Sequence, residues 1–161
     1  MPLVTPTRDP DLDGAVRAAE LAYSRLVLIT GSGHRGKSQR LAQLRSDSFS
    51  VVNLGTELSR RLLTIPADLR ASQAEDSVAR IIEDAGTKRV GLDNTEILFE
   101  AQLSLNPLEL LKALSRFRLL VATWNGDYVD GCLFFGARTH PSHRDYRPTD
   151  LRDIQIIQQA P

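Results

Sequence analysis

Residues 31–38 read Gly31-Ser32-Gly33-His34-Arg35-Gly36-Lys37-Ser38 and match the phosphate-loop pattern G-x-x-x-x-G-K-S/T at every fixed position. A continuous apolar run at residues 25–30 precedes this Walker A segment and has the length and composition of a buried central strand. Leu41 and Leu44 follow it at a spacing typical of a helix. A strand, a glycine-rich turn and a helix in this order form the context in which the pattern binds phosphate. The sequence therefore predicts a P-loop.

The residue types of this segment suit a nucleoside triphosphate. The glycines let backbone N–H groups of residues 31–38 surround the β-phosphate, and the start of the helix adds its partial positive charge. Lys37 can reach the β- and γ-phosphates, while the Ser38 hydroxyl can coordinate Mg²⁺. The chain lacks the N/T-K-x-D motif that reads guanine, which disfavours a GTPase. We expect ATP and Mg²⁺ as the ligands.

A carboxylate is expected beside the phosphates at the end of another strand. The apolar run at residues 89–93 ends in Asp93, and open α/β sheets bind ligands at the carboxyl ends of their strands. Asp93 is the Walker B candidate that would hold Mg²⁺ together with Ser38. The next position, where many P-loop ATPases place a water-polarising glutamate, is Asn94. Glu96 is the nearest carboxylate that could replace it, and a solvated surface role is the alternative.

Further candidates follow the strand expected over residues 118–123. Thr123 and Asn125 would end this strand beside the P-loop strand, where a polar group could sense the γ-phosphate or orient water. A turn before Gly126 is the alternative role. Trp124 is expected to pack in the core rather than to stack on a base. The possible arginine fingers, each also suited to a surface position, are Arg60, Arg61, Arg116, Arg138, Arg144 and Arg147.

Composition limits the other classes of function. The 161 residues set an expectation of one domain, with an N-terminal helix in residues 1–24, a core in 25–136 and a tail or edge element in 137–161. Twenty basic and twenty acidic residues cancel, which argues against a protein built mainly to coat nucleic acid. The single Cys132 indicates a reducing compartment, and no apolar run is long enough for a membrane span. His140 and His143 lack a third ligand at a suitable spacing, so a loop is favoured over a metal site.

Strand-like and helix-like segments alternate along the chain, which is typical of an α/β fold with a parallel sheet and flanking helices. We expect the ASCE, AAA-like type of P-loop NTPase, in which an extra strand separates the Walker A and Walker B strands, without a clear lid domain. The remaining strands are expected at residues 49–54 and near 133–135. A first further helix is expected to open at Asp9 and Pro10, with Leu12, Val16, Ala19 and Tyr23 on one face, and a second is expected over Thr56 to Leu63. A third should follow a capping box at Ser72 and Glu75 and stop at Gly86. A fourth should open at Asn106 and Pro107.

Three further stretches are more distinctive than the P-loop. They are residues 52–63 (Val-Asn-Leu-Gly-Thr-Glu-Leu-Ser-Arg-Arg-Leu-Leu), 92–99 (Leu-Asp-Asn-Thr-Glu-Ile-Leu-Phe) and 121–126 (Val-Ala-Thr-Trp-Asn-Gly). With the segment from His140 to Tyr146, they resemble the BrxF family of small P-loop proteins from type 3 BREX bacteriophage-defence systems. The resemblance covers residues 20–147. It implies a cytoplasmic bacterial protein that acts beside a larger ATPase and a DNA methyltransferase in antiviral defence, with Asn94 as the family's own residue.

These observations predict an ATP-binding protein that is a slow, Mg²⁺-dependent ATPase, with Lys37, Asp93, Glu96 and Asn125 as its catalytic residues. One alternative is an assembly or binding module that ATP controls with little turnover. Another is a small-metabolite kinase, although Asn53 stands where such enzymes carry an acidic residue. A second copy of the chain, or the larger BREX ATPase, is expected to complete the site. Direct contact with DNA stays open.

Overall fold

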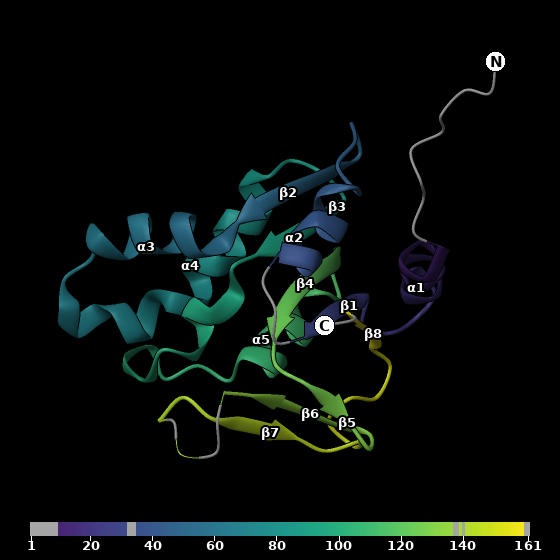
Figure 1. Ribbon diagram of the computed structural model, residues 1–161. Helices are drawn as coiled ribbons and strands as arrows, with labels where there is room; N and C mark the ends of the chain where they lie inside the picture. Colours follow the sequence, from purple (N-terminus) through teal and green to yellow (C-terminus); the bar gives the residue numbers. More distant parts are fainter. Residues whose placement is uncertain (1–9, 32–34, 137–138, 140, 160–161) are drawn as a thin grey trace.

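A five-stranded parallel sheet forms the centre of the protein (Figure 1). The computed structural model describes residues 10–31, 35–136, 139 and 141–159. The sheet has the strand order β2-β3-β4-β1-β8, with β1 at Leu26–Gly31, β2 at Phe49–Asn53, β3 at Arg89–Asp93, β4 at Leu119–Asn125 and β8 at Gln155–Gln158. All neighbouring strands run parallel. The expected α/β class is confirmed, and β4 lies between β1 and β3 as the predicted inserted strand.

Helices cover both faces of this sheet. Helices α1 (Pro10–Glu20) and α2 (Arg35–Ala42) pack on one face, where Val27 and Ile29 of β1 join one apolar cluster. Helices α3 (Leu54–Leu63), α4 (Arg70–Asp84) and α5 (Pro107–Leu114) cover the other face, where Leu26 and Leu28 join a second cluster. Successive side chains of a strand point to opposite faces. An apolar run such as β1 therefore fits a strand buried on both sides.

A small antiparallel sheet follows β4 and packs beside α5 (Figure 1). It consists of β5 (Tyr128–Val129), β6 (Cys132–Phe135) and β7 (Arg144–Tyr146). Trp124 anchors it: the indole Nε1 donates to the Phe134 carbonyl at 2.9 Å, and the side chain is fully buried. The expected packing role of Trp124 is confirmed. Gly126 lies so close that a Cβ there would be 1.7 Å from the Phe134 carbonyl oxygen.

Two local predictions about helix ends were wrong. Helix α4 begins at Arg70, after a single 3₁₀ turn η1 (Ala67–Leu69), so Ser72 lies inside the helix. Its hydroxyl donates to the Leu69 carbonyl at 2.9 Å instead of capping the helix. Tyr23 follows the end of α1 and is exposed, with the Arg116 guanidinium 4.9 Å from its ring centroid. Asp9 lies outside the described residues.

Other signals at element boundaries were confirmed. Asn106 caps α5 by accepting from the Glu109 backbone N–H at 3.4 Å, and Pro107 is the first helical residue. Gly86, with φ 76°, lies two residues beyond the end of α4, at Asp84. Two 3₁₀ turns, η2 (Thr95–Phe99) and η3 (Ala101–Leu103), connect β3 to the region before α5. This connection brings Glu96 to the carboxyl edge of the sheet, where β3 ends.

Candidate nucleotide-binding site

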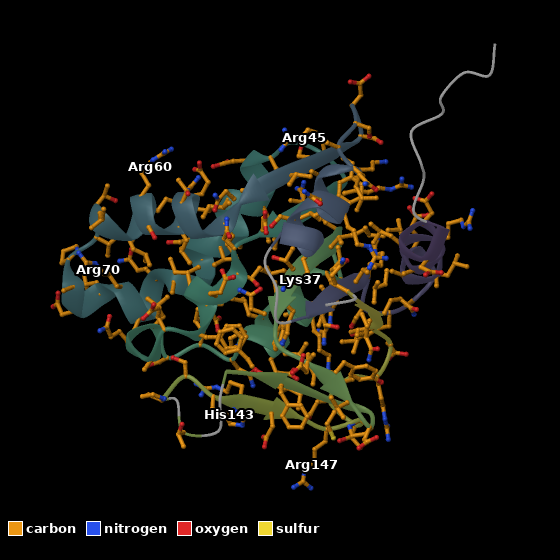
Figure 2. All side chains as sticks on the ribbon, in the orientation of Figure 1. Lys37, Arg45, Arg60, Arg70, His143 and Arg147 are labelled. Carbon is orange, nitrogen blue, oxygen red and sulfur yellow. The ribbon has the colours of Figure 1, made fainter. Side chains whose placement is uncertain are left out.

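Lys37 lies in the first turn of α2 and carries its ammonium group into the protein. The residue is 1% exposed, and its Nζ donates to the Gly31 carbonyl at 2.5 Å. Burial lowers the pKa of Lys37, while the nearby charges of Glu96, Asp93 and Asp127 act in the opposite direction. A cation in this setting is stabilised by any further anion that it meets. Lys37 is therefore a buried cation at the end of β1, with acidic groups close by (Figure 2).

Asp93 joins three elements at the carboxyl edge of the sheet. Its Oδ1 accepts from the Ser38 hydroxyl at 3.0 Å and from the Thr123 hydroxyl at 3.1 Å. The Asn94 backbone N–H donates to the same oxygen at 2.9 Å. The structure thus brings together residues from α2, β3 and β4 that lie far apart in the sequence. Ser38 and Asp93, the two candidate Mg²⁺ ligands, are direct neighbours.

The donor atoms at this position fit Mg²⁺ with a bound nucleotide. Mg²⁺ prefers oxygen ligands and is commonly held by one or two protein groups, with phosphates and water completing the octahedron. A hydroxyl and a carboxylate oxygen supply that set. Among the described residues, no group of three or more His, Cys, Asp or Glu side chains could hold a metal ion by itself. A Mg²⁺ ion held by Ser38 and Asp93 would need its remaining ligands from phosphate and water.

Glu96 and Asn125 form a polar pair beside Lys37. Asn125 ends β4 opposite Gly31, and its side-chain Nδ2 donates to Glu96 Oε1. Glu96 also acts electrostatically on Lys37. Asn94 precedes Glu96 with φ 54°, a left-handed turn that redirects the chain after β3. Because of this turn, Glu96 lies near Lys37, although Asn94 is the residue directly after Asp93.

Sequence reasoning missed Thr95. Its hydroxyl is buried and donates to the Thr123 carbonyl, which ties the start of η2 to β4. This bond fixes the chain between Asp93 and Glu96. An isolated threonine after a strand gives no pattern from which the contact could have been predicted, because the partner is a backbone atom on a distant strand.

Gln159 is a second missed residue, and it lies against the candidate phosphate loop (residues 31–38). Its backbone N–H donates to the Thr30 carbonyl at 2.8 Å, and its Oε1 accepts from Arg40 at 3.2 Å. A Cβ at Gly36 would be 2.4 Å from Gln159 Nε2, and one at Gly31 would be 3.2 Å from Gln159 Cβ. Gly31 also has φ 147°, which favours glycine. The backbone conformation of Gly31 therefore favours glycine, whereas a Cβ at Gly36 would have to displace the side chain of Gln159.

The described candidate arginine fingers have other partners or point away from Lys37. Arg60 pairs with Glu57 on α3, and Arg61 of α3 pairs with Asp84 at the end of α4. Arg144 donates to the His143 carbonyl at 3.0 Å. Figure 2 shows Arg60 and Arg147 directed outward, on opposite sides of the molecule. Arg116 contacts Tyr23, as described above.

Several candidates fall outside the described residues. These are Ser32, Gly33, His34, Arg138 and His140, together with the side chain of Arg35. His143 is described, and its Nδ1 is 3.0 Å from the Gly136 carbonyl oxygen. This contact fits the loop role expected for the histidine segment.

Comparison with protein-family models, with curated proteins and with solved structures finds no match for the chain. Within the described residues, every helix is too short or too polar to cross a bilayer.

Proposed function

We propose that the protein binds ATP with Mg²⁺ at the candidate phosphate loop, and that it is a slow ATPase. The observation that carries the proposal is the 3.0 Å hydrogen bond between Ser38 and Asp93, with the buried Lys37 beside it. A hydroxyl, a carboxylate and a lysine at the carboxyl ends of parallel strands are the groups that position a metal and a triphosphate.

Each group has a separate part in the proposed chemistry. The backbone of residues 31–38 and the start of α2 would hold the β-phosphate, and Lys37 would neutralise the β- and γ-oxygens. Ser38 and Asp93 would hold Mg²⁺, which supplies charge neutralisation at the phosphates. Glu96, oriented by Asn125, would accept a proton from the attacking water. Gln159 would support the loop from behind.

Calorimetric titration with Mg-ATP tests nucleotide binding. Lys37→Ala should weaken ATP binding by about 3 kcal/mol or more, over a hundredfold, because at least two charge-assisted contacts are lost. Lys88→Ala is the control, since Lys88 is exposed and lies before β3. Equal affinity of the wild type and Lys37→Ala would contradict the proposal. Competition with GTP in the same titration measures the selectivity for ATP.

We also propose that the protein is a cytoplasmic component of a BREX-type antiviral system, on the sequence resemblance of residues 52–63, 92–99 and 121–126. The larger ATPase of such a system, or a second copy of this chain, would supply the missing positive charge at the γ-phosphate. Co-expression with the larger ATPase and the methyltransferase, followed by size-exclusion chromatography, tests the association. Loss of phage protection on Lys37→Ala, with normal protein levels, would link the nucleotide site to defence.

A further inference from the structure

A cavity of about 720 Å³ adjoins the candidate nucleotide site on the side away from β1. It lies at the carboxyl ends of β2 and β3, between α3, the start of α4 and the η2–η3 connection. No described residue of the candidate phosphate loop lines it, but Asn94 and Glu96 do. Its volume is in the range of small-molecule sites in proteins. The cavity is therefore a separate space that shares Glu96 with the candidate nucleotide site.

Arg70 gives one end of this cavity a fixed positive charge. Its Nε donates to the Leu62 carbonyl at 2.8 Å and to the Ile65 carbonyl at 3.0 Å, which holds the guanidinium in place. Its two terminal nitrogens have no hydrogen-bond or ion-pair partner among the described residues. A guanidinium held in this way presents a planar fork that matches a carboxylate or a phosphate. Figure 2 shows Arg70 at the outer end of the α3–α4 pair, well separated from Lys37.

Apart from Glu96 and the exposed carboxylate of Glu100, the remaining walls offer neutral polar groups and a short apolar surface. Asn53, Thr56 and Ser59 line the α3 side with one amide and two hydroxyl groups. The Asn53 Oδ1 accepts from the Thr56 N–H, which leaves the amide N–H groups for another acceptor. Leu103 and Ile97 line the opposite side. Amides and hydroxyls recognise hydroxyl groups, and the aliphatic side chains suit the C–H faces of the same molecule.

We propose that this cavity binds a hydroxyl-rich organic anion, a sugar acid or a sugar phosphate, with its anionic group at Arg70 and a hydroxyl at Glu96. Because Glu96 belongs to both spaces, occupation of the cavity should change the affinity for Mg-ATP, and ATP should change the affinity for the anion by the same factor. The coupling rests on the proposed function. Binding of the anion does not.

Calorimetric titrations of the full chain with gluconate, glucose 6-phosphate and glucose test the proposal. Gluconate carries a carboxylate on an open six-carbon chain, glucose 6-phosphate carries a phosphate on a sugar ring, and glucose is the same ring without a charge. At least one anion should bind at millimolar concentration or below, and glucose should bind at least about tenfold more weakly. Binding of gluconate would show that the cavity recognises a carboxylate, and binding of glucose 6-phosphate would show that it recognises a phosphate. If neither anion binds, or if glucose binds equally well, the proposal is wrong.

Variants separate the cavity from the nucleotide site. Arg70→Ala should reduce anion affinity by about tenfold or more, whereas Arg60→Ala, an exposed arginine outside the cavity, should leave it unchanged. Because Arg70 also bonds to two carbonyls, Ser59→Tyr is a second test: it fills the cavity from an exposed helix position and should block binding without loss of folding. Full anion affinity in both Arg70→Ala and Ser59→Tyr would overturn the proposal.

Titrations of the wild type and of Lys37→Ala with the anion and with Mg-ATP distinguish failure of this proposal from failure of the proposed function. The variant should retain anion binding and lose the coupling to Mg-ATP. If the wild type binds the anion but not ATP, the proposed function is wrong and the cavity assignment stands. If the wild type binds both ligands with unchanged affinities in the presence of each other, the shared role of Glu96 is wrong.

Discussion

Lys37 is a buried lysine whose protonated form is disfavoured by its surroundings. Burial lowers its pKa in the folded state, despite the opposing charges of Glu96, Asp93 and Asp127. Between that lowered pKa and the ordinary pKa of lysine, the unfolded chain binds more protons than the folded one. The free energy of unfolding must therefore gain a contribution from Lys37 as the pH rises through this window.

Lys37→Met tests this linkage in the absence of nucleotide. We expect the unfolding free energy of the wild type, relative to the variant, to increase with pH across the alkaline window, since methionine does not titrate. Urea denaturation at a series of pH values measures the difference, in which the titration of all other groups cancels to first order. A difference that falls with pH would mean that the pKa of Lys37 is raised rather than lowered.

Asp93 should matter for metal binding more than for folding. In Asp93→Asn, the amide oxygen can still accept from Ser38 and Thr123, so the melting temperature without ligand should stay close to that of the wild type. The additional stabilisation by Mg-ATP should be lost, because a neutral oxygen holds Mg²⁺ weakly. Thermal denaturation with and without Mg-ATP measures both effects.

The control for Asp93→Asn is Asp127→Asn, which removes another negative charge near Lys37 from an exposed position. It should retain stabilisation by Mg-ATP. A large loss of stability in ligand-free Asp93→Asn would instead assign Asp93 a structural role.

Glu96 should affect turnover more than ATP affinity. Glu96→Gln keeps a hydrogen-bond acceptor for Asn125 but cannot take a proton from water, so the rate of phosphate release should fall at least about tenfold. ATP affinity should change much less, because Glu96 is not one of the proposed metal ligands. Glu100→Gln, the next carboxylate in the sequence and exposed, is the control. An unchanged rate in Glu96→Gln would mean that this carboxylate is only a solvated partner of Asn125.

The close contact between β4 and the small antiparallel sheet depends on Gly126, which has no side chain. Gly126→Ala would place a Cβ at 1.7 Å from the Phe134 carbonyl oxygen, which also accepts from Trp124. Backbone atoms on both sides would have to move. We expect a loss of at least about 1–3 kcal/mol in unfolding free energy.

Gly14→Ala is the matched control, because Gly14 is inside α1 and nothing lies within 4 Å of the position that an added Cβ would take. This change should stabilise the protein by up to about 1 kcal/mol through helix propensity. Urea denaturation of both variants gives the two values. A lower unfolding free energy in Gly126→Ala together with a higher one in Gly14→Ala would support the close approach at Gly126. An unchanged unfolding free energy in Gly126→Ala would contradict it.

The elements that could be predicted from sequence are those whose signal is local. Strands β1 and β4 are apolar over most of their length and β3 has an apolar centre, while Lys37, Ser38 and Asp93 follow from fixed spacing and strand ends. Strand β8 (Gln-Ile-Ile-Gln) is too short and polar to stand out, and its place beside β1 depends on pairing across most of the chain. The contacts of Gln159 with the candidate phosphate loop could not be predicted for the same reason.

At Ser72, by contrast, a local sequence pattern was present but predicted the wrong start of the helix. The spacing of Ser72 and Glu75 suits a capping box, yet Arg70 and the turn before it already continue into α4. The carbonyls of Leu62 and Ile65 hold Arg70 in place, so tertiary contacts set where this helix begins.

The described candidate arginine fingers of the proposed ATPase contact other groups or point away from Lys37. The candidate fingers Arg60, Arg61 and Arg116 are engaged on other elements. An arginine finger contributes about 10³–10⁵ in rate. The isolated chain should therefore hydrolyse ATP well below the usual enzyme range of about 1–10³ per second.

A steady-state ATPase assay over a wide range of protein concentration, with light scattering on the same samples, tests this expectation. The rate per chain should rise as the protein associates, or when the larger ATPase of the proposed BREX system is added, if either supplies an arginine in trans. An assembly module controlled by ATP would associate with little increase in rate. Fast hydrolysis by a monomeric sample, independent of concentration, would show that one chain completes the site.

The position of β8 beside β1 has a consequence for synthesis on the ribosome. Strand β1 leaves the exit tunnel early, whereas its neighbour β8 and Gln159 are among the last described residues to be translated. Until then, one edge of β1 has unpaired backbone groups that can pair with other nascent chains. The support behind Gly36 is also missing during this period. If the proposed function holds, a growing chain should therefore bind Mg-ATP tightly only after residue 159 has emerged.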